Sequence, residues 1–385
     1  MPVIPEIESF NDDLIAIRRD FHEHPELGME EVRTSGIVAD LLRQWGVEVH
    51  TGIGKTGVVG VLNGNGPGRT IGLRADMDAL PIEEKTNLPF ASKTPGVMHA
   101  CGHDAHTTML LGAARYLANS KNFSGKAIFI FQPAEEGLGG ARAMLADALF
   151  DRFPCDEIYG MHNNPNGEPG TVAVKPGQAM AGADFFDIRI KASGSHAAHP
   201  QESIDPIIIA TNLVQQLQSI VSRNVSPTEP LVLSVTQIHA GAAYNVIPSD
   251  CTISGTMRFF DSDLADKVRQ RIKDLCAGMA TGFNVEVEFD NREIFSVLVN
   301  DETLSHAMLD IASDVVGKQN STITTELQTG SEDFADMLHV IPGAYCNVGH
   351  EGSLPLHNDG FFLDESILPI GASIYARLIE QRTAL

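Results

Sequence analysis

The feature that most constrains the fold is an alternation of short apolar runs with amphipathic segments. Apolar runs occur at 57–62, 70–74, 126–131 and 157–161, and the periodicity predicts helices at 6–23, 30–45 and 107–119. Continuous apolar runs of this length are typical of strands buried on both faces, with helices as the covering layers. The chain is therefore expected to form an α/β domain with a mixed sheet flanked by helices.

The pattern changes between residues 183 and 294. Strands are predicted at 183–192, 231–239, 251–259 and 284–289, with helices at 205–222 and 262–280. This β-α-β-β-α-β order is the ferredoxin-like α+β arrangement. Alternation resumes after about residue 295, with a strand at 344–349 and a closing helix at 367–381. We therefore predict a first domain formed by 1–182 and 295–385, with 183–294 as an inserted domain.

Polar side chains follow three of the predicted strands of the first domain. Asp76 and Asp78 follow the second run, Glu135 and Glu136 follow the third, and His162 follows the fourth. In open α/β sheets, ligands bind at the carboxyl ends of the strands. These groups are therefore expected to converge there with the loop 98–106.

That loop lies in the stretch MHACGHDAHTT, residues 98–108, which contains Cys101, three histidines and Asp104. A Cys-x-His pair beside a glycine can bring a thiolate and an imidazole to one cation, and zinc and its neighbours prefer such ligands. The loop is therefore predicted to supply half of a metal site. The alternative is a buried thiol with solvated histidines.

Further candidate ligands come from QPAEEG, GMHN and PLHN. Adjacent glutamates point in different directions, so one can bind metal while the other faces a substrate. The candidate ligands are Cys101, His103, Glu136, His162 and His357. If one of five ligands bridges, each of two ions receives three protein contacts, which favours a dinuclear site with open positions. Mixed ligands of this kind accept Zn, Mn, Co or Ni.

The charge balance restricts the possible partners. Lys and Arg number 27 against 50 Asp and Glu, for a formal charge of -23. Nucleic acids and anionic membranes both need a positive face, so neither is expected as a partner. The N-terminal stretch has no signal-like pattern, no run of 18 apolar residues occurs, and the five scattered cysteines fit reduced thiols. We therefore expect a cytoplasmic protein.

Collinear motifs link the chain to a known family. They are RADMDALP, MHACGHDAH, FQPAEEG, GMHN, GSHAAHP, NVIP, GTMR, GSEDFA and LHN. In this order they resemble the M20 metallopeptidases, specifically the amidohydrolase branch of hippurate hydrolases, N-acyl-amino-acid amidohydrolases and auxin-conjugate hydrolases. The resemblance implies a zinc-peptidase-like catalytic domain. It also implies that the inserted domain is a lid that mediates dimerisation in many members.

Site roles follow from the resemblance position by position. It implies the same five metal ligands, with Cys101 as the bridge between two divalent ions and Glu135 as the general base. Asp78 is implied to lie behind the ligands and orient one of them. In the lid, His196 is implied to donate to the developing oxyanion, often across a subunit interface. Asn245 and Arg258 are implied to hold the substrate carboxylate.

Simpler interpretations of the lid residues remain open. His196 and His199 are also explained as ordinary polar residues at a strand end, and Arg258 as half of a surface salt bridge. The resemblance favours a homodimer or homotetramer formed through the lid domain, with the apolar helix 205–222 as a plausible interface.

The expected reaction is hydrolysis of N-acyl amino acids, with hippurate-like substrates, by metal-activated water and Glu135. One alternative is a dipeptidase or carboxypeptidase that uses the same site. A thiol hydrolase with Cys101 as nucleophile is a second alternative. A non-catalytic metal-binding protein is the third, although a closed structural site has no need of the spare carboxylate Glu135.

Overall fold

The computed structural model describes residues 3–352 and 354–384. The chain divides into two compact units. Unit 1 comprises Met1–Ala179, Leu298–Glu326 and Asp333–Leu385, and unit 2 comprises Met180–Val297 and Leu327–Glu332. The predicted insertion at 183–294 falls within unit 2. The segment Leu327–Glu332 was not predicted there; it joins unit 2 because the Ala181 amide donates to the carbonyl oxygens of Gln328 and Gly330.

Unit 1 is built on one mixed sheet with the strand order β1-β2-β4-β3-β5-β16-β6-β15. β3 pairs in parallel with β4 and β5, and β5 pairs in parallel with β16. β1–β2, β2–β4 and β16–β6 are antiparallel. The mixed α/β sheet is therefore confirmed. Its strands are β1 (Glu48–Ile53), β2 (Gly57–Asn63), β3 (Thr70–Asp76), β4 (Lys126–Gln132), β5 (Glu157–Asn164), β6 (Val172–Val174), β15 (Ser321–Ile323) and β16 (Gly343–Gly349), with a separate pair β7 (Gly177–Met180) and β14 (Leu298–Asn300).

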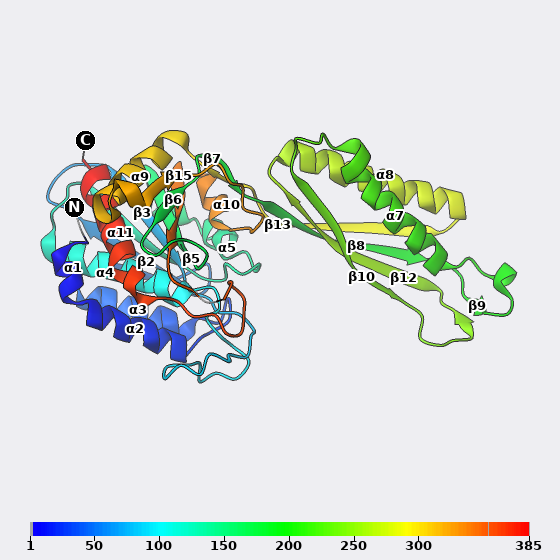
Figure 1. The fold of residues 1–385 in the computed structure, drawn as a ribbon, viewed down its shortest axis with the longest axis horizontal. Coiled ribbons are helices and arrows are strands. Elements are labelled where there is room, and N and C mark those ends of the chain that lie inside the picture. The colour runs from blue at the N-terminus through cyan, green and yellow to red at the C-terminus, as the bar shows by residue number, and fades with distance from the viewer. Residues whose placement is uncertain (1–2, 353, 385) are drawn as a thin grey trace. The chain divides into compact units, whose positions relative to one another are not determined.

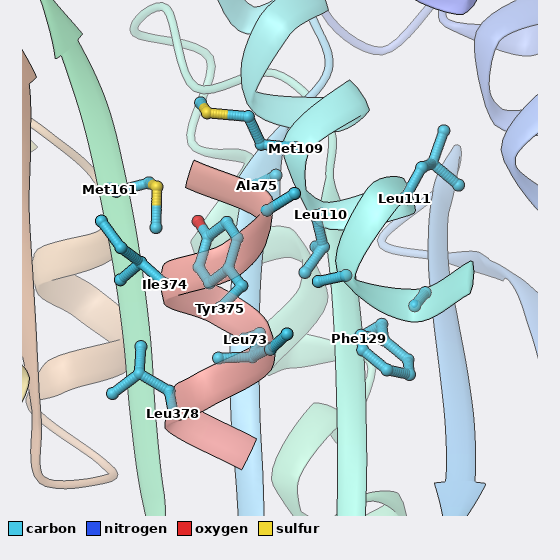
Figure 2. Close-up of a cluster of buried hydrophobic side chains, with 14 of the residues drawn as sticks. Leu73, Ala75, Met109, Leu110, Leu111, Phe129, Met161, Ile374, Tyr375 and Leu378 are labelled. Atoms are coloured by element: carbon cyan, nitrogen blue, oxygen red, sulfur yellow. The ribbon is translucent and has the colours of Figure 1, made fainter. Parts of the chain in front are cut away.

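Helices cover both faces of this sheet (Figure 1). α4 and α11 lie against each other over the central strands, and Figure 2 shows Tyr375 of α11 beside Leu110 of α4, Ile374 of α11 on the side of Met161, and Leu73 of β3 below Tyr375. All five side chains are buried, so this contact forms the centre of the core. The helices are α1 (Pro5–Ser9), α2 (Asn11–Glu23), α3 (Val32–Gln44), α4 (His103–Ser120), α5 (Gly140–Ala146), α6 (Leu149–Arg152), α9 (Glu302–Val316), α10 (Phe334–Leu338) and α11 (Leu368–Arg382), with 3-10 turns at Lys318–Asn320 and Glu365–Ile367.

Two helix predictions for unit 1 differ from the structure, and several of its elements were not predicted, among them β1, β6, β15 and α9. The helix predicted at 6–23 is two helices, because Phe10 leaves helical geometry at φ -116° and ψ 22°. The helix predicted at 107–119 begins earlier, at His103, after Gly102. Strand β1 was missed because it is a largely exposed edge strand without an apolar run.

Unit 2 follows the order β8 (Gly182–Lys191), α7 (Pro206–Asn224), β10 (Leu231–Ala240), β12 (Asp250–Phe259), α8 (Ser262–Phe283) and β13 (Glu286–Phe295). Its sheet has the strand order β10-β12-β8-β13, with each pair antiparallel. Both helices cover one face (Figure 1) and share a core with Ile188, Ile253 and Leu213. Asp205 and Asp261 cap the two helices by accepting from the amides of Ile207 and Leu264.

A short antiparallel strand pair also belongs to this unit: β9 (Ser195–His196) pairs with β11 (Val246–Ile247), and a 3-10 turn follows β9 at Pro200–Glu202. In the part of the chain that the structure describes, no helix is long and apolar enough to cross a membrane.

Candidate active site

The loop that precedes α4 carries the first two candidate ligands. Cys101 lies in the loop, and His103 is the first residue of the helix. Gly102 between them has φ 89°, a left-handed conformation that glycine adopts without steric cost. This turn lets the Cys101 thiol and the His103 imidazole face the same centre although they stand on different elements.

The five predicted ligands and Glu135 come together in unit 1. Groups of ligand atoms that all lie within 4.8 Å of one another are formed by Cys101, His103 and His162, by Cys101, Glu136 and His357, and by His103, Glu135 and Glu136. The Cys101 sulfur is 3.4 Å from His162 Nε2, and Glu136 Oε1 is 3.2 Å from His357 Nε2. Cys101, His103 and Glu136 each belong to two of the three groups. Because the three groups share these residues, they form one cluster, as two neighbouring cations require.

The outer nitrogens of two histidines are already engaged. His162 Nδ1 donates to the carbonyl oxygen of Asn163 at 2.6 Å, and His103 Nδ1 is 3.2 Å from Asp78 Oδ1. In a neutral ring, a proton on Nδ1 leaves a lone pair on Nε2. Among the described residues, the buried atom His103 Nε2 makes no hydrogen bond. A buried imidazole nitrogen with a free lone pair, beside a thiol and carboxylates, fits a divalent metal ion.

Asp78 connects two of the candidate ligands. One carboxylate oxygen faces His103 Nδ1, and the other accepts from the backbone amide of Glu136 at 3.0 Å. Asp78 is 1% exposed, so these contacts are sheltered from water. The side chain thus lies behind the cluster, where it orients an imidazole and a glutamate together.

A buried residue that the sequence analysis missed supports the glutamate pair. Glu31 accepts from the Ala134 amide at 2.8 Å and from the Thr56 hydroxyl at 2.6 Å. Burial raises the pKa of Glu31. Ala134 has φ 53°, unusual for a residue with a side chain, and the contact from Glu31 stabilises that turn just before Glu135. In the sequence, Glu31 resembles an acidic residue at a helix start, so no local signal marks its role.

Protonation equilibria in the cluster reflect its burial and its negative charge. Burial raises the pKa of the Cys101 thiol and lowers the pKa of His162 well below its usual value. Hydrogen bonds with Cys101 and Glu136 raise the pKa of the more exposed His357 to about 10. For His103, burial opposes protonation, but the charges of Asp76 and Cys101 outweigh it and raise its pKa. Such an excess of anionic groups favours a bound cation.

The remaining predicted residues lie in unit 2. His196 pairs with Val246 across β9 and β11, and the neighbouring Asn245 accepts from the Ala197 amide through its carbonyl oxygen at 2.9 Å. His196 is exposed, and its Nδ1 accepts from the Ala198 amide at 3.1 Å. A neutral His196 ring therefore carries its proton on Nε2, where it can be donated to a ligand.

Arg258 lies far from that pair. It stands near the Phe259 end of β12, whereas Asn245 precedes the Asp250 end. At about 3.3 Å per residue, the part of β12 from Asp250 to Arg258 alone spans roughly 25 Å. Arg258 forms no ion pair with any described residue, so the predicted alternative of a surface salt bridge is wrong. Its guanidinium lies over the Phe185 ring and bonds to the Met257 carbonyl oxygen and the Thr256 hydroxyl.

A model of the peptidase family M20/M25/M40 matches residues 72–381. The chain belongs to this family. It is 41% identical to hippurate hydrolase from Campylobacter jejuni over 378 residues, covering 98% of both chains. It is 40% identical to N-acetylcysteine deacetylase from Bacillus subtilis, covering 96% of this chain and 97% of that one. It is 38% identical to thermostable carboxypeptidase 1 from Saccharolobus solfataricus, covering 97% and 96%.

Solved structures of M20 peptidases share the fold. A candidate aminohydrolase from methicillin-resistant Staphylococcus aureus is 32% identical, with a TM-score of 0.91 and 99% of both chains covered. Bacillus subtilis YXEP, described as a dinuclear metal-binding peptidase of the M20 family, is 36% identical, with a TM-score of 0.83 and 98% and 99% covered. The predicted M20 resemblance is confirmed, and the protein is a metal-dependent amidohydrolase of this family.

Proposed function

We propose that this M20 enzyme hydrolyses the amide bond of N-acyl amino acids, with hippurate-like substrates, at a dinuclear metal site. The observation that carries the proposal is the position of Glu135. Its carboxylate lies within 4.8 Å of ligand atoms of His103 and Glu136, and its side chain is buried beside a cluster of potential metal ligands. A purely structural metal site has no need of such an additional carboxylate.

Cys101, His103, Glu136, His162 and His357 would hold the two ions. Cys101 belongs both to the group with His103 and His162 and to the group with Glu136 and His357, which supports it as the bridge. When bound, two divalent ions supply positive charge that acidifies the attacking water and polarises the acyl carbonyl. The ligand set is compatible with Zn, Mn, Co or Ni.

Glu135 acts as the general base. Its carboxylate takes a proton from the attacking water while the water oxygen bonds to the acyl carbon. The same carboxyl group then returns that proton to the amide nitrogen as the carbon–nitrogen bond breaks. The products are a carboxylic acid from the acyl group and a free amino acid.

His196, Asn245 and Arg258 are proposed to contact the substrate. The exposed Nε2–H of His196 suits a donor to the developing oxyanion. A guanidinium and an amide suit the α-carboxylate of the amino acid. Because Asn245 precedes the Asp250 end of β12 and Arg258 lies roughly 25 Å along that strand, a small carboxylate can contact both only if they come from different copies.

Unit 2 therefore serves, in this proposal, as the lid and as the interface of a homodimer or homotetramer. β10 is an edge strand of the sheet, so its outer backbone groups are open to another strand. Val232 and Ile238 on β10 and Ile208 on α7 are exposed, with 41%, 49% and 58% of their surface accessible. An edge strand beside exposed apolar side chains supports pairing with a second copy.

A carboxypeptidase or dipeptidase activity is the second candidate. The S. solfataricus relative named carboxypeptidase covers almost the whole chain, which favours this candidate beside the amidohydrolase. Comparing kcat/KM for hippurate with kcat/KM for an unblocked dipeptide decides between them.

The experiment that tests the proposal combines a metal count with turnover. Elemental analysis is expected to find two ions per chain, and hippurate hydrolysis is expected to cease on chelation and return with added metal. Hydrolysis that persists without metal would contradict the proposal and favour Cys101 as a nucleophile.

A further inference from the structure

Behind the candidate metal ligands lies a buried hydrogen-bond network centred on Asn163. This residue follows His162 on β5 and is 1% exposed. Its neighbours in the network are His106, His350 and the carbonyl group of Cys101, and both imidazoles are fully buried. The mechanism proposed above does not use the side chains of Asn163, His106 or His350.

The backbone of Asn163 sets the proton positions of two histidines. Its amide donates to His106 Nε2 at 3.0 Å, so the His106 proton is on Nδ1, which donates to Asp76 Oδ1 at 2.6 Å. Its carbonyl oxygen accepts from His162 Nδ1 at 2.6 Å, which leaves a lone pair on His162 Nε2, the nitrogen that faces Cys101. Asp76 is in turn held by Arg74 at 2.7 Å. Asn163 is therefore anchored to the sheet while it orients a ligand.

The side chain of Asn163 holds the other ligand segment. Asn163 Nδ2 donates to the Cys101 carbonyl oxygen at 2.6 Å. This contact fixes the orientation of the amide, because a carbonyl oxygen can only accept. Asn163 Oδ1 must then accept, and it does so from His350 Nε2 at 2.9 Å. In this orientation of the amide, both polar atoms of the Asn163 side chain form hydrogen bonds.

The loop that carries Cys101 and His103 packs closely against the Asn163 side chain. A Cβ atom added at Gly102 would lie 2.3 Å from Asn163 Nδ2 and 3.0 Å from Asn163 Cγ. Gly102 thus lets the loop between Cys101 and His103 lie directly against the amide. The loop contacts the Asn163 side chain and is hydrogen-bonded to it through the Cys101 carbonyl oxygen.

We propose that Asn163 is the positioning residue that sets the Cys101–His103 loop at the correct distance from His162. The inference rests on the proposed metal site, since it concerns how the ligands of that site are arranged. Groups of this kind, which orient ligands without touching the metal, typically change metal affinity by about 10- to 100-fold when they are removed.

Asn163→Asp is the sharpest test, because it keeps the shape of the side chain but loses the N–H donor to Cys101. The probe is Co²⁺ titrated into metal-free protein, since absorption from thiolate-to-cobalt charge transfer reports the bond to Cys101. We expect a Kd about 10- to 100-fold higher than that of the wild type and a weaker charge-transfer band. Glu157→Gln is the matched control. It removes a buried carboxylate at the other end of β5 and should leave the Kd and the band unchanged.

Circular dichroism of the metal-free proteins separates a positioning role from loss of folding. If Asn163→Asp does not fold, His350→Ala takes its place, because it removes the bond to Asn163 Oδ1 from outside the ligand segments. That variant is expected to raise the Kd by a smaller factor. The positioning role would be overturned if folded Asn163→Asp had the same Kd for Co²⁺ and the same charge-transfer band as the wild type. The same result in His350→Ala would overturn it where that variant is used. No cobalt–thiolate band in the wild-type protein would instead overturn the proposed metal site.

Discussion

Glu135 and Glu136 are adjacent in sequence but have different surroundings. The Glu136 amide is held by Asp78, and its carboxylate lies beside His357, whereas Glu135 is buried next to His103. The difference arises in the turn at Ala134, which Glu31 stabilises. At the scale of single residues, the two carboxylates are therefore suited to different roles.

Glu135→Gln is expected to keep both metal ions and to lower kcat for hippurate by at least about 10²- to 10⁴-fold, because the amide cannot accept the proton of the water. Elemental analysis and initial rates measure the two effects. Glu136→Gln is the matched comparison and should lose metal as well as activity. Near-normal turnover by Glu135→Gln would remove Glu135 from the role of base.

At the scale of elements, buried ion pairs fasten the ends of strands and helices. Glu157 at the start of β5 accepts from Arg382 at the end of α11 at 2.6 and 2.9 Å and from the Tyr159 hydroxyl at 2.7 Å. Arg69 adds a further contact at 2.6 Å. The last helix is thereby joined to the centre of the sheet, on which the candidate ligand His162 lies.

Glu157→Gln is expected to lower the free energy of unfolding by about 1.5–3 kcal/mol, because hydrogen bonds to a charged group are lost. Burial opposes ionisation of Glu157, but the contacts with Arg382 and Tyr159 outweigh it and lower its pKa. A depressed pKa stabilises the fold above the unfolded value of about 4.3, and that stabilisation is lost as the pH falls. The difference in Tm between wild type and variant should therefore be largest near neutral pH and narrow below about pH 4. A constant difference would contradict this account.

The helix cap at Asp261 gives a second prediction at this scale. Asp261 accepts from the Leu264 amide at 2.9 Å and begins α8. Asp261→Ala should destabilise the protein by about 1 kcal/mol, whereas Asp261→Asn should be close to neutral. Urea denaturation measures both, and equal losses in the two variants would argue against the cap.

At the scale of the whole molecule, the proposed roles of Asn245 and Arg258, together with their separation along unit 2, predict that activity depends on assembly. A charge on an edge strand blocks pairing with another strand. Ile238→Lys on β10 is expected to give a monomer with kcat/KM for hippurate reduced by at least about 10-fold, in keeping with the loss of a carboxylate contact. Light scattering gives the mass in solution. Val340→Lys, at a similarly exposed position of unit 1, is the control and should change neither property. A fully active Ile238→Lys monomer would show that one chain suffices.

Much of this molecule follows from local sequence. Apolar runs of strand length predicted β2 to β5 because a strand buried on both faces needs apolar side chains at consecutive positions. The candidate ligands were also evident, since Cys101, His103, Glu136, His162 and His357 stand at the ends of such runs or in loops beside glycine, and their binding of metal stays a prediction. Edge strand β1 was not evident, because an exposed strand leaves no apolar pattern. The break at Phe10 was not evident, because the apolar spacing of Ile7, Phe10 and Leu14 continues across it.

Only the tertiary structure decided how those residues are arranged. Glu31 and Asn163 act on segments that are distant in sequence, and a hydrogen bond across 62 to 103 positions leaves no local signal. The same holds for which nitrogen of His103 and of His162 carries the ring proton, because that depends on what binds the opposite side of each ring. The sequence by itself determined the chemistry of the donor groups, because composition and periodicity are local. Their orientation was decided by the fold, because it depends on contacts between elements.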